Sequence, residues 1–391
     1  MVYKVLTLNQ ISVNGLDRFP RDQYEIASEF SHPDAILLRS HKLAMSEIAD
    51  TVACIGRAGV GTNNIPVAEC TTRGIPVFNA PGANANAVKE LVAAALLLGS
   101  RGIVGGINYV HTLKDVTDEA ELHRTLEAQK KRFKGSELTG KTLGVVGLGA
   151  IGSMVAEMAL TLGMDVCGYD PALSVEAAWR LSSNVKKVDA LASLFGRCDY
   201  ISLHLPVLDS TRGLINGELL QGAREGTCLL NFARQEIVDT DAIAKALDSG
   251  RLRSYIADFP QPALIGRDDV ILMPHIGAST EEAEENCAIM AADQIRDFIE
   301  NGNIRNSVNF PTLLLEPTEG TRIAISNENV PKMLGNLLSI FADENINVID
   351  MLNKSRDDIA YTLIDVETAP SEALVTQMRE VEGVITVRVI G

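Results

Sequence analysis

The side chains best suited to chemistry in this sequence are Arg234 and His275. Each closely follows a strand-like run, Thr227-Cys228-Leu229-Leu230 in one case and Val270-Ile271-Leu272-Met273 in the other. Oxidation of a hydroxyl group needs a base that takes the hydroxyl proton and a cation that holds a carboxylate and polarises the carbonyl. A single histidine is more often structural, as we expect of His32, His41, His111 and His123. The position of both residues beyond strands of one sheet favours a catalytic role.

A glycine-rich turn between residues 142 and 170 has the spacing of a dinucleotide-binding site. A buried strand-like run leads into Gly147-Leu148-Gly149-Ala150-Ile151-Gly152, and a helical run and a second strand-like run end at Asp170. Gly147 permits a tight turn, Gly149 lets a pyrophosphate approach, and Gly152 lets the helix pack close to the strand. The helix N-terminus offers N–H groups to phosphates, and Asp170 lies 18 residues after Gly152, as a ribose-binding carboxylate should. The complete context disfavours the alternative, a glycine turn without a ligand.

Polar loops also follow the strand-like runs of the first 84 residues. These loops begin at Arg39-Ser40, at Arg57 and at Asn79, and the last of them ends at Asn84. Ligands of open α/β sheets gather at the carboxyl ends of strands, so the three loops predict one wall of a binding cleft. The basic run Lys130-Lys131-Arg132 is either a solvated helix face or a phosphate contact.

Composition narrows the class of protein. The chain has 391 residues, 46% hydrophobic and 22% charged, which is typical of two or three soluble globular domains. A formal net charge of −16 argues against binding to nucleic acid or to anionic membranes. Six scattered cysteines without a C-x-x-C pair, and the absence of a signal peptide, predict reduced thiols in a cytoplasmic protein. We expect no metal site.

Alternating strand and helix signals predict an α/β protein. We expect a Rossmann doubly wound parallel sheet over residues 99–280, inserted in a flavodoxin-like α/β domain formed by residues 1–98 and 281–310. Residues 311–320 contain two prolines and a glycine and are expected to be a linker. The strand and helix signals of residues 321–391 predict a ferredoxin-like βαββαβ unit.

The spacing of the glycine turn, the arginine loop and the Pro274-His275-Ile276-Gly277 loop resembles the D-isomer-specific 2-hydroxyacid dehydrogenases. The Arg39-Ser40 loop, the Arg57 loop and the βαββαβ unit resemble the branch that acts on a phosphorylated 2-hydroxy acid and carries a C-terminal regulatory ACT domain. The resemblance covers essentially the whole chain. It implies NAD-dependent oxidation of D-3-phosphoglycerate to 3-phosphohydroxypyruvate, the first step of L-serine synthesis. It also implies a homodimer or homotetramer.

The resemblance assigns roles to individual positions. Arg234 would bind the substrate carboxylate and His275 would be the general acid/base. NAD would contact Gly147, Gly149, Ala150, Ile151, Gly152, Asp170, His204, Phe232, Ala233, Arg234, Asp258, His275, Gly277 and Ala278. The substrate would contact Arg39, Ser40, Arg57, Asn84 and, through a neighbouring subunit, Lys130. An amino-acid effector, serine by analogy, would contact Asn327, Asn329 and Asn347.

Three positions depart from the family pattern. Gln261 stands where the family has a glutamate that hydrogen-bonds the catalytic histidine, so either a neutral amide or another acid such as Asp268 or Asp269 orients His275. Gln235 replaces a glycine after the arginine, and Lys332 replaces a glycine at the effector site. Two other activities remain open: reduction of another 2-oxo acid, such as 2-oxoglutarate or hydroxypyruvate, and NAD sensing without catalysis.

Overall fold

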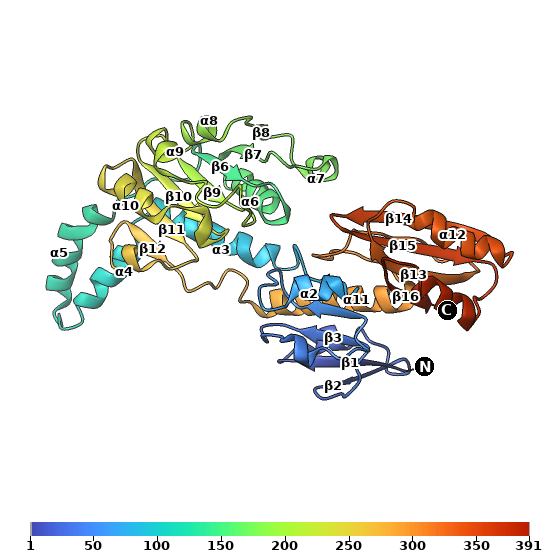
Figure 1. Cartoon of the computed structure of the whole chain (residues 1–391). Coiled ribbons are helices and arrows are strands. Elements are labelled where there is room, and N and C mark those ends of the chain that lie inside the picture. The colour runs from blue at the N-terminus through green and yellow to red at the C-terminus, as the bar shows by residue number, and fades with distance from the viewer. Residues whose placement is uncertain (1, 391) are drawn as a thin grey trace. The chain divides into compact units, whose positions relative to one another are not determined.

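The computed structural model describes residues 2–390, which form two compact units (Figure 1). The first unit contains the chain up to Asn84 and from Glu281 onward, and the second is Ala85–Thr280. The expected domain boundary at residue 98 falls near the end of helix α3 (Ala85–Ser100), whereas the whole of α3 belongs to the second unit. Gly99 explains this assignment, because a Cβ there would lie 2.8 Å from Ile256, so α3 packs tightly on the second unit's sheet.

The N-terminal part of the first unit is a five-stranded parallel sheet. Its strands lie in the order β2-β1-β3-β4-β5, which is the flavodoxin-like order. The strands are β1 (Tyr3–Leu8), β2 (Tyr24–Ala27), β3 (Ala35–Leu38), β4 (Cys54–Arg57) and β5 (Val77–Phe78). All four side chains of β3 are buried, as expected of a central strand covered on both faces. The short edge strand β2 was not predicted, because Glu25 interrupts its apolar residues and it lacks the continuous apolar run of β3.

Helix α11 (Glu281–Asn301) covers one face of this sheet. The approach is close at Gly56 of β4, where a Cβ would lie 2.6 Å from Cδ1 of Ile295. Shorter helices complete this part: α1 (Val13–Leu16), α2 (Val67–Thr72) and the 3₁₀ turn Met45–Glu47. The acids Glu281, Glu282 and Glu284 occupy the first turn of α11, where negative charge complements the helix dipole.

The C-terminal part of the first unit is an antiparallel sheet in the order β14-β15-β13-β16. Its elements are β13 (Thr321–Glu328), α12 (Met333–Asp343), β14 (Val348–Arg356), β15 (Ile359–Val366), α13 (Glu372–Arg379) and β16 (Val384–Ile390). Ile323, Ile325 and Ile364 pack against α12 and α13 on one face. Tyr361 and Leu363 join the hydrophobic core formed with α11 on the other. The predicted βαββαβ unit is confirmed.

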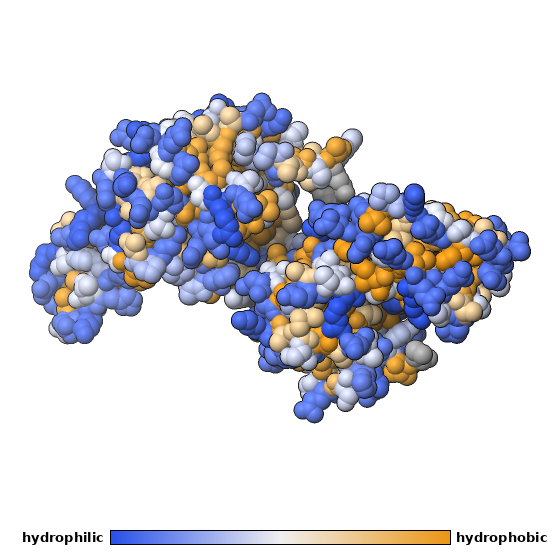
Figure 2. Space-filling model, viewed as in Figure 1, coloured by the Kyte–Doolittle hydropathy of each residue, from blue (hydrophilic) through white to orange (hydrophobic). Residues whose placement is uncertain are grey.

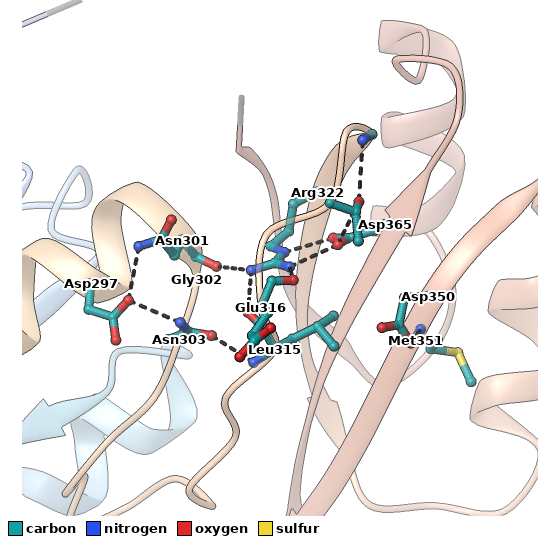
Figure 3. A network of polar contacts seen from close by, with 12 residues as sticks. Asp297, Asn301, Gly302, Asn303, Leu315, Glu316, Arg322, Asp350, Met351 and Asp365 are labelled. Carbon is teal, nitrogen blue, oxygen red and sulfur yellow. Dashed lines mark hydrogen bonds and ion pairs between the residues drawn. The ribbon is translucent and has the colours of Figure 1, made fainter.

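A buried ion pair fastens this sheet to the end of α11 (Figure 3). The Arg322 guanidinium donates to both carboxylate oxygens of Asp365, at 2.7 and 2.8 Å. Its remaining N–H groups donate to the carbonyl oxygens of Asn301, Leu315 and Glu316, at 3.0, 2.8 and 2.7 Å. The segment predicted to be a linker is therefore held in place at residues 315 and 316. Removing one partner of such a buried pair costs about 3–5 kcal/mol.

The second unit has a seven-stranded parallel sheet in the order β12-β11-β10-β9-β6-β7-β8. The strands are β6 (Thr142–Val146), β7 (Asp165–Tyr169), β8 (Val185–Lys187), β9 (Tyr200–Leu203), β10 (Thr227–Asn231), β11 (Leu252–Ala257) and β12 (Val270–Leu272). The order reverses between β6 and β9, which is where a Rossmann sheet binds its ligand, at the carboxyl ends of the strands. The predicted Rossmann fold is confirmed.

Helices cover both faces of the Rossmann sheet and extend from it. They are α3, α4 (Ile103–Thr112), α5 (Glu119–Gln129), α6 (Ala150–Thr161), α7 (Val175–Arg180), α8 (Leu191–Phe195), α9 (Gly217–Gln221) and α10 (Thr240–Asp248). The turns Lys130–Phe133, Gln235–Ile237 and Pro262–Leu264 are 3₁₀-helical. No single helix within residues 2–390 meets the length and apolarity needed to cross a bilayer. Among these described residues, the bent pair α3 and α4, with an angle of 68° between them, meets it when taken together.

Candidate functional site

The glycine turn after β6 has the shape that a dinucleotide needs. Gly147 adopts a φ of 90°, and a Cβ there would lie 2.5 Å from the carbonyl oxygen of His204. A Cβ at Gly152 would lie 1.9 Å from the carbonyl oxygen of Gly147, so the helix can approach the turn only with glycine. A Cβ at Gly149 would meet nothing within 4 Å. No side chain caps α6 at Gly149, which leaves its first N–H groups available to a phosphate.

This difference between two glycines gives a paired prediction. Gly149→Ala should leave the thermal midpoint nearly unchanged and weaken NADH binding about ten-fold, because the methyl group enters the space that a pyrophosphate needs. Gly152→Ala should lower the free energy of unfolding by about 1–3 kcal/mol, because the methyl group collides with the backbone. Thermal unfolding and NADH fluorescence titration measure both. Equal losses of stability in the two variants would contradict the assignment of Gly149 to ligand binding.

The Asp170 carboxylate lies at the end of β7 beside the glycine turn. Its Oδ2 accepts a hydrogen bond from the Leu148 amide at 2.8 Å, and its Oδ1 accepts one from the Ala172 amide at 2.9 Å. These two bonds orient the carboxylate and leave each oxygen with a free lone pair. The arrangement fits a group that accepts further hydrogen bonds from two adjacent hydroxyls.

The loop after β10 carries Arg234 and is organised by Asn231. The buried Asn231 amide donates to the carbonyl oxygen of Arg234 at 3.0 Å, and its oxygen accepts from the Ala233 amide at 3.1 Å. Arg234 itself donates from Nη1 to the carbonyl oxygen of Ala233 at 2.7 Å. The loop is therefore rigid at the backbone of the arginine predicted to bind a carboxylate.

The loop that carries His275 is held by Asp258. This carboxylate is 2% exposed and accepts from the Ile276 and Gly277 amides at 2.8 and 2.7 Å. His275 adopts a φ of 57°, which is uncommon for a residue other than glycine. Within residues 2–390 its side chain makes no hydrogen bond or ion pair. Asp258 thus fixes the His275 loop through its backbone, and its contact with a cofactor stays a prediction.

Phe259 joins the two predicted catalytic residues. Its ring centroid lies 4.8 Å from that of the His275 imidazole, with the rings tilted by 55°. Cζ of Arg234 lies 5.8 Å from the centroid of the same ring. The structure thus brings Arg234 and His275 to one aromatic side chain. Sequence reasoning missed Phe259, since an isolated phenylalanine after a strand resembles a core residue.

His204 follows β9 and is held neutral. Its Nε2 lies 2.8 Å from Oγ of Ser202, and its Nδ1 is buried without a hydrogen-bond partner. Burial lowers the pKa of His204 to about 3, because the charged form would lose its hydration. The backbone of His204 also lines the glycine turn, as the contact with Gly147 shows. A neutral imidazole at this position suits a polar contact to an uncharged group rather than to a phosphate.

The residues expected to orient His275 make other contacts. Gln261 is 5% exposed, and its Oε1 is buried without a hydrogen-bond partner. It lines a cavity of about 440 Å³, whose other lining residues are Gln235, Glu236, Val238, Thr240, Pro262 and Ala263. Asp269 is paired twice with Arg267 at 2.9 Å, which lowers the pKa of that carboxyl. Neither side chain bonds to His275 in the part of the chain that the structure describes.

In the first unit, the cationic loops after β3 and β4 meet. Arg57 donates from Nε to the carbonyl oxygen of Arg39 at 3.1 Å. Arg39 pairs with Glu284 of α11 at 2.5 Å. The Ser40 amide donates to the side chain of Asn9 at 3.0 Å. Arg39, Ser40 and Arg57 are thus brought together as predicted from their position after strands. Glu284 was missed, because 245 residues separate it from Arg39.

The remaining predicted residues lie at separate places. Asn84 has its Oδ1 buried and unpartnered, and Lys130 pairs with Glu127 on an exposed helix end. In the C-terminal sheet, Asn327 is buried, whereas Asn329 and Asn347 are exposed. The Asn329 amide donates to the carbonyl oxygen of Asp357 at 3.1 Å, and the Asn347 amide donates to the carboxylate of Glu367 at 2.8 Å. Lys332 adopts a φ of 71° at the start of α12. The backbone there has the conformation that glycine prefers.

Comparison with known proteins agrees with this geometry. Residues 107–277 match the model of the D-isomer specific 2-hydroxyacid dehydrogenase NAD-binding domain. The chain is 36% identical to a D-3-phosphoglycerate dehydrogenase of Haemophilus influenzae, covering 98% of this chain and 93% of the relative. It is 33% identical to that of Escherichia coli, covering 88% and 82%. An NAD⁺-bound 3-phosphoglycerate dehydrogenase of Entamoeba histolytica superposes with a TM-score of 0.61 and 27% identity, over 80% of this chain and 100% of that one.

Proposed function

Because this chain is a member of the D-isomer specific 2-hydroxyacid dehydrogenase family, we propose that it is a D-3-phosphoglycerate dehydrogenase that uses NAD. The reaction oxidises C2 of D-3-phosphoglycerate to give 3-phosphohydroxypyruvate and supplies L-serine synthesis. The cluster of Arg39 and Arg57 is the observation that supports a phosphorylated substrate. Arg234 alone would be enough to bind an unphosphorylated 2-hydroxy acid. We further propose a cytoplasmic location.

The chain's own residues bind the substrate and move one proton. Bound NAD accepts the hydride from C2. Its pyrophosphate would lie over Gly149 and its ribose hydroxyls against Asp170, the two places where the turn is open and the carboxylate is oriented. Arg234 binds the substrate carboxylate, and His275 takes the C2 hydroxyl proton at an imidazole nitrogen. In the reverse direction the His275 imidazolium returns that proton to the carbonyl oxygen.

A panel of 2-oxo acids tests the proposal. The purified protein is mixed with NADH and with 3-phosphohydroxypyruvate, hydroxypyruvate or 2-oxoglutarate, and the loss of NADH absorbance is followed. We expect the highest kcat/KM for the phosphorylated acid. The second candidate is a 2-oxoglutarate reductase, because Arg39 and Arg57 also suit a second carboxylate. A preference for 2-oxoglutarate would favour that activity, and NADH binding without any turnover would favour a sensor.

Asp170 should select NAD over NADP. Its oriented carboxylate would repel a 2′-phosphate, and Pro171 and Ala172 follow it rather than an arginine. The preference for NADH is the kcat/KM with NADH divided by the kcat/KM with NADPH. Asp170→Ala should therefore lower this ratio by about ten-fold or more. The ratio is measured with each cofactor at fixed substrate. Equal or better turnover of the native protein with NADPH would show that Asp170 does not select the cofactor.

We propose that the C-terminal sheet pairs two subunits and is a weak effector site at most. Strand β14 is an open edge of that sheet, and Ile349 on this strand is exposed. Hydrophobic residues gather on the face of the C-terminal sheet that Figure 2 shows. A homodimer or homotetramer is the assembly that we propose.

Lys332 is the reason to expect little inhibition by serine. A long cation at a backbone position suited to glycine would occupy the space that the amine of a small zwitterion needs. Millimolar serine should leave the native activity nearly unchanged and should inhibit Lys332→Gly. The initial rate with increasing serine measures both. Strong inhibition of the native protein by sub-millimolar serine would overturn this interpretation.

A further inference from the structure

The environment of His275 lacks the group that usually orients a catalytic histidine. A general base must be held in one orientation, and a carboxylate that accepts its second ring N–H is a common means. Within residues 2–390 no carboxylate lies within ion-pair distance of His275, and Gln261 does not bond to it. The imidazole is exposed at the end of a loop with a φ of 57°. Another contact must therefore restrict its rotation.

The only ring contact of His275 among the described residues is Phe259. A centroid separation of 4.8 Å with a 55° tilt lies in the favourable range for an aromatic pair. Phe259 is itself half-buried, and the carboxylate of the residue before it, Asp258, accepts hydrogen bonds from the amides of Ile276 and Gly277. The phenyl ring and the imidazole are thus mounted on two loops that are hydrogen-bonded to each other immediately beside both residues.

Phe259 also contacts Arg234, whose Cζ is 5.8 Å from the ring centroid. A phenyl ring attracts a cation placed near it, and both the guanidinium and the imidazolium are cations during the reaction. The ring therefore interacts favourably with both side chains. Among the described residues, no aromatic pair or cation–ring contact without Phe259 includes Arg234 or His275.

We infer that Phe259 is the positioning residue for His275 and Arg234, in the place of the missing acid. It touches neither a reacting atom nor the cofactor in this role. It fixes the imidazole by packing and keeps the arginine at a set distance from it. This inference rests on the proposed dehydrogenase function, and its test includes a measurement that does not depend on turnover.

The test compares Phe259→Leu, which keeps an apolar side chain without a ring, with Phe259→Tyr, which keeps the ring. Phe133→Leu is the matched control, because Phe133 also contacts an aromatic ring, Tyr109 at 5.5 Å, and an arginine, Arg132 at 5.7 Å. We expect Phe259→Leu to lower kcat about ten-fold with KM and NADH affinity within about two-fold, since orientation acts on the transition state. Phe259→Tyr should restore kcat, and Phe133→Leu should not change it.

The measurement independent of turnover is the ¹H–¹³C NMR spectrum of the histidine side chains, with His275 assigned from a His275→Asn variant. The Phe259 ring current should displace the His275 ring protons from their random-coil shifts. This displacement should vanish in Phe259→Leu and return in Phe259→Tyr. An unchanged His275 signal in Phe259→Leu, or a kcat within two-fold of native, would overturn the inference. If the native protein shows the displaced His275 signal but has no turnover, the proposed function is contradicted and the inference about Phe259 is not.

Discussion

Replacing His275 should cost about 10²–10⁴-fold in kcat and leave NADH binding nearly unchanged, because a general acid/base contributes a factor of that size. The φ of 57° at this position decides the choice of variants. Asparagine adopts a positive φ more readily than alanine does, so His275→Asn separates lost chemistry from backbone strain. Both His275→Ala and His275→Asn should lose turnover, and His275→Asn should keep the native thermal midpoint.

Three measurements are needed for this prediction: kcat with 3-phosphohydroxypyruvate, the dissociation constant of NADH and the thermal midpoint. Loss of NADH binding together with kcat would mean that His275 acts through the cofactor site. A kcat near the native value in His275→Asn would remove His275 from the mechanism.

The second large effect is expected at the phosphate-binding arginines. Arg57→Ala should lower kcat/KM for 3-phosphohydroxypyruvate about ten-fold or more, because a charge-assisted bond to a phosphate is worth about 1.5–3 kcal/mol. Turnover of unphosphorylated hydroxypyruvate should change little. Arg39→Ala should behave in the same way but less strongly, because in the structure Arg39 is already paired with Glu284. A phosphate must compete with that carboxylate, so Glu284→Gln should increase the affinity for the phosphorylated acid.

Arg18 provides the control for these variants. It pairs with Asp293 of α11 at 2.7 Å, as Arg39 pairs with Glu284 of the same helix, but it lies outside the loops that follow β3 and β4. Arg18→Ala should leave the preference for the phosphorylated acid unchanged. Equal losses on phosphorylated and unphosphorylated acids in Arg57→Ala would point to a structural role for Arg57.

Most of the fold could be predicted from the sequence, because long buried strands and glycine turns leave strong local patterns. The Rossmann sheet and the C-terminal βαββαβ unit are examples, and Gly147 and Gly152 are required by the close backbone approaches in the turn. The separate helix α4 was not predicted, since its glycines at 105 and 106 resemble a loop and its apolar face is not buried within the unit. Edge and surface elements are determined by packing that a single sequence does not display.

The site was predicted in part for the same reason. Arg234, His275, Arg39 and Arg57 follow strands, and parallel strands bring their ends to one edge of a sheet. Phe259 and Glu284 could not be found in this way, because their roles depend on contacts between segments distant in sequence. The expectation that Gln261 stands beside His275 came from a matched position in a loop shorter than the family's, and the structure shows no bond between the two side chains.

The most direct test of the proposed function is to follow hydride from its carbon of origin. The native protein is incubated with NAD, D-3-phosphoglycerate deuterated at C2, and hydrazine to trap the 2-oxo product. The proposed function predicts singly deuterated NADH and an equal amount of trapped 3-phosphohydroxypyruvate, and it predicts no reaction with the L-isomer. Reduced cofactor without deuterium would contradict it. So would the absence of reduced cofactor from 3-phosphoglycerate when a parallel incubation with 2-hydroxyglutarate deuterated at C2 gives deuterated NADH.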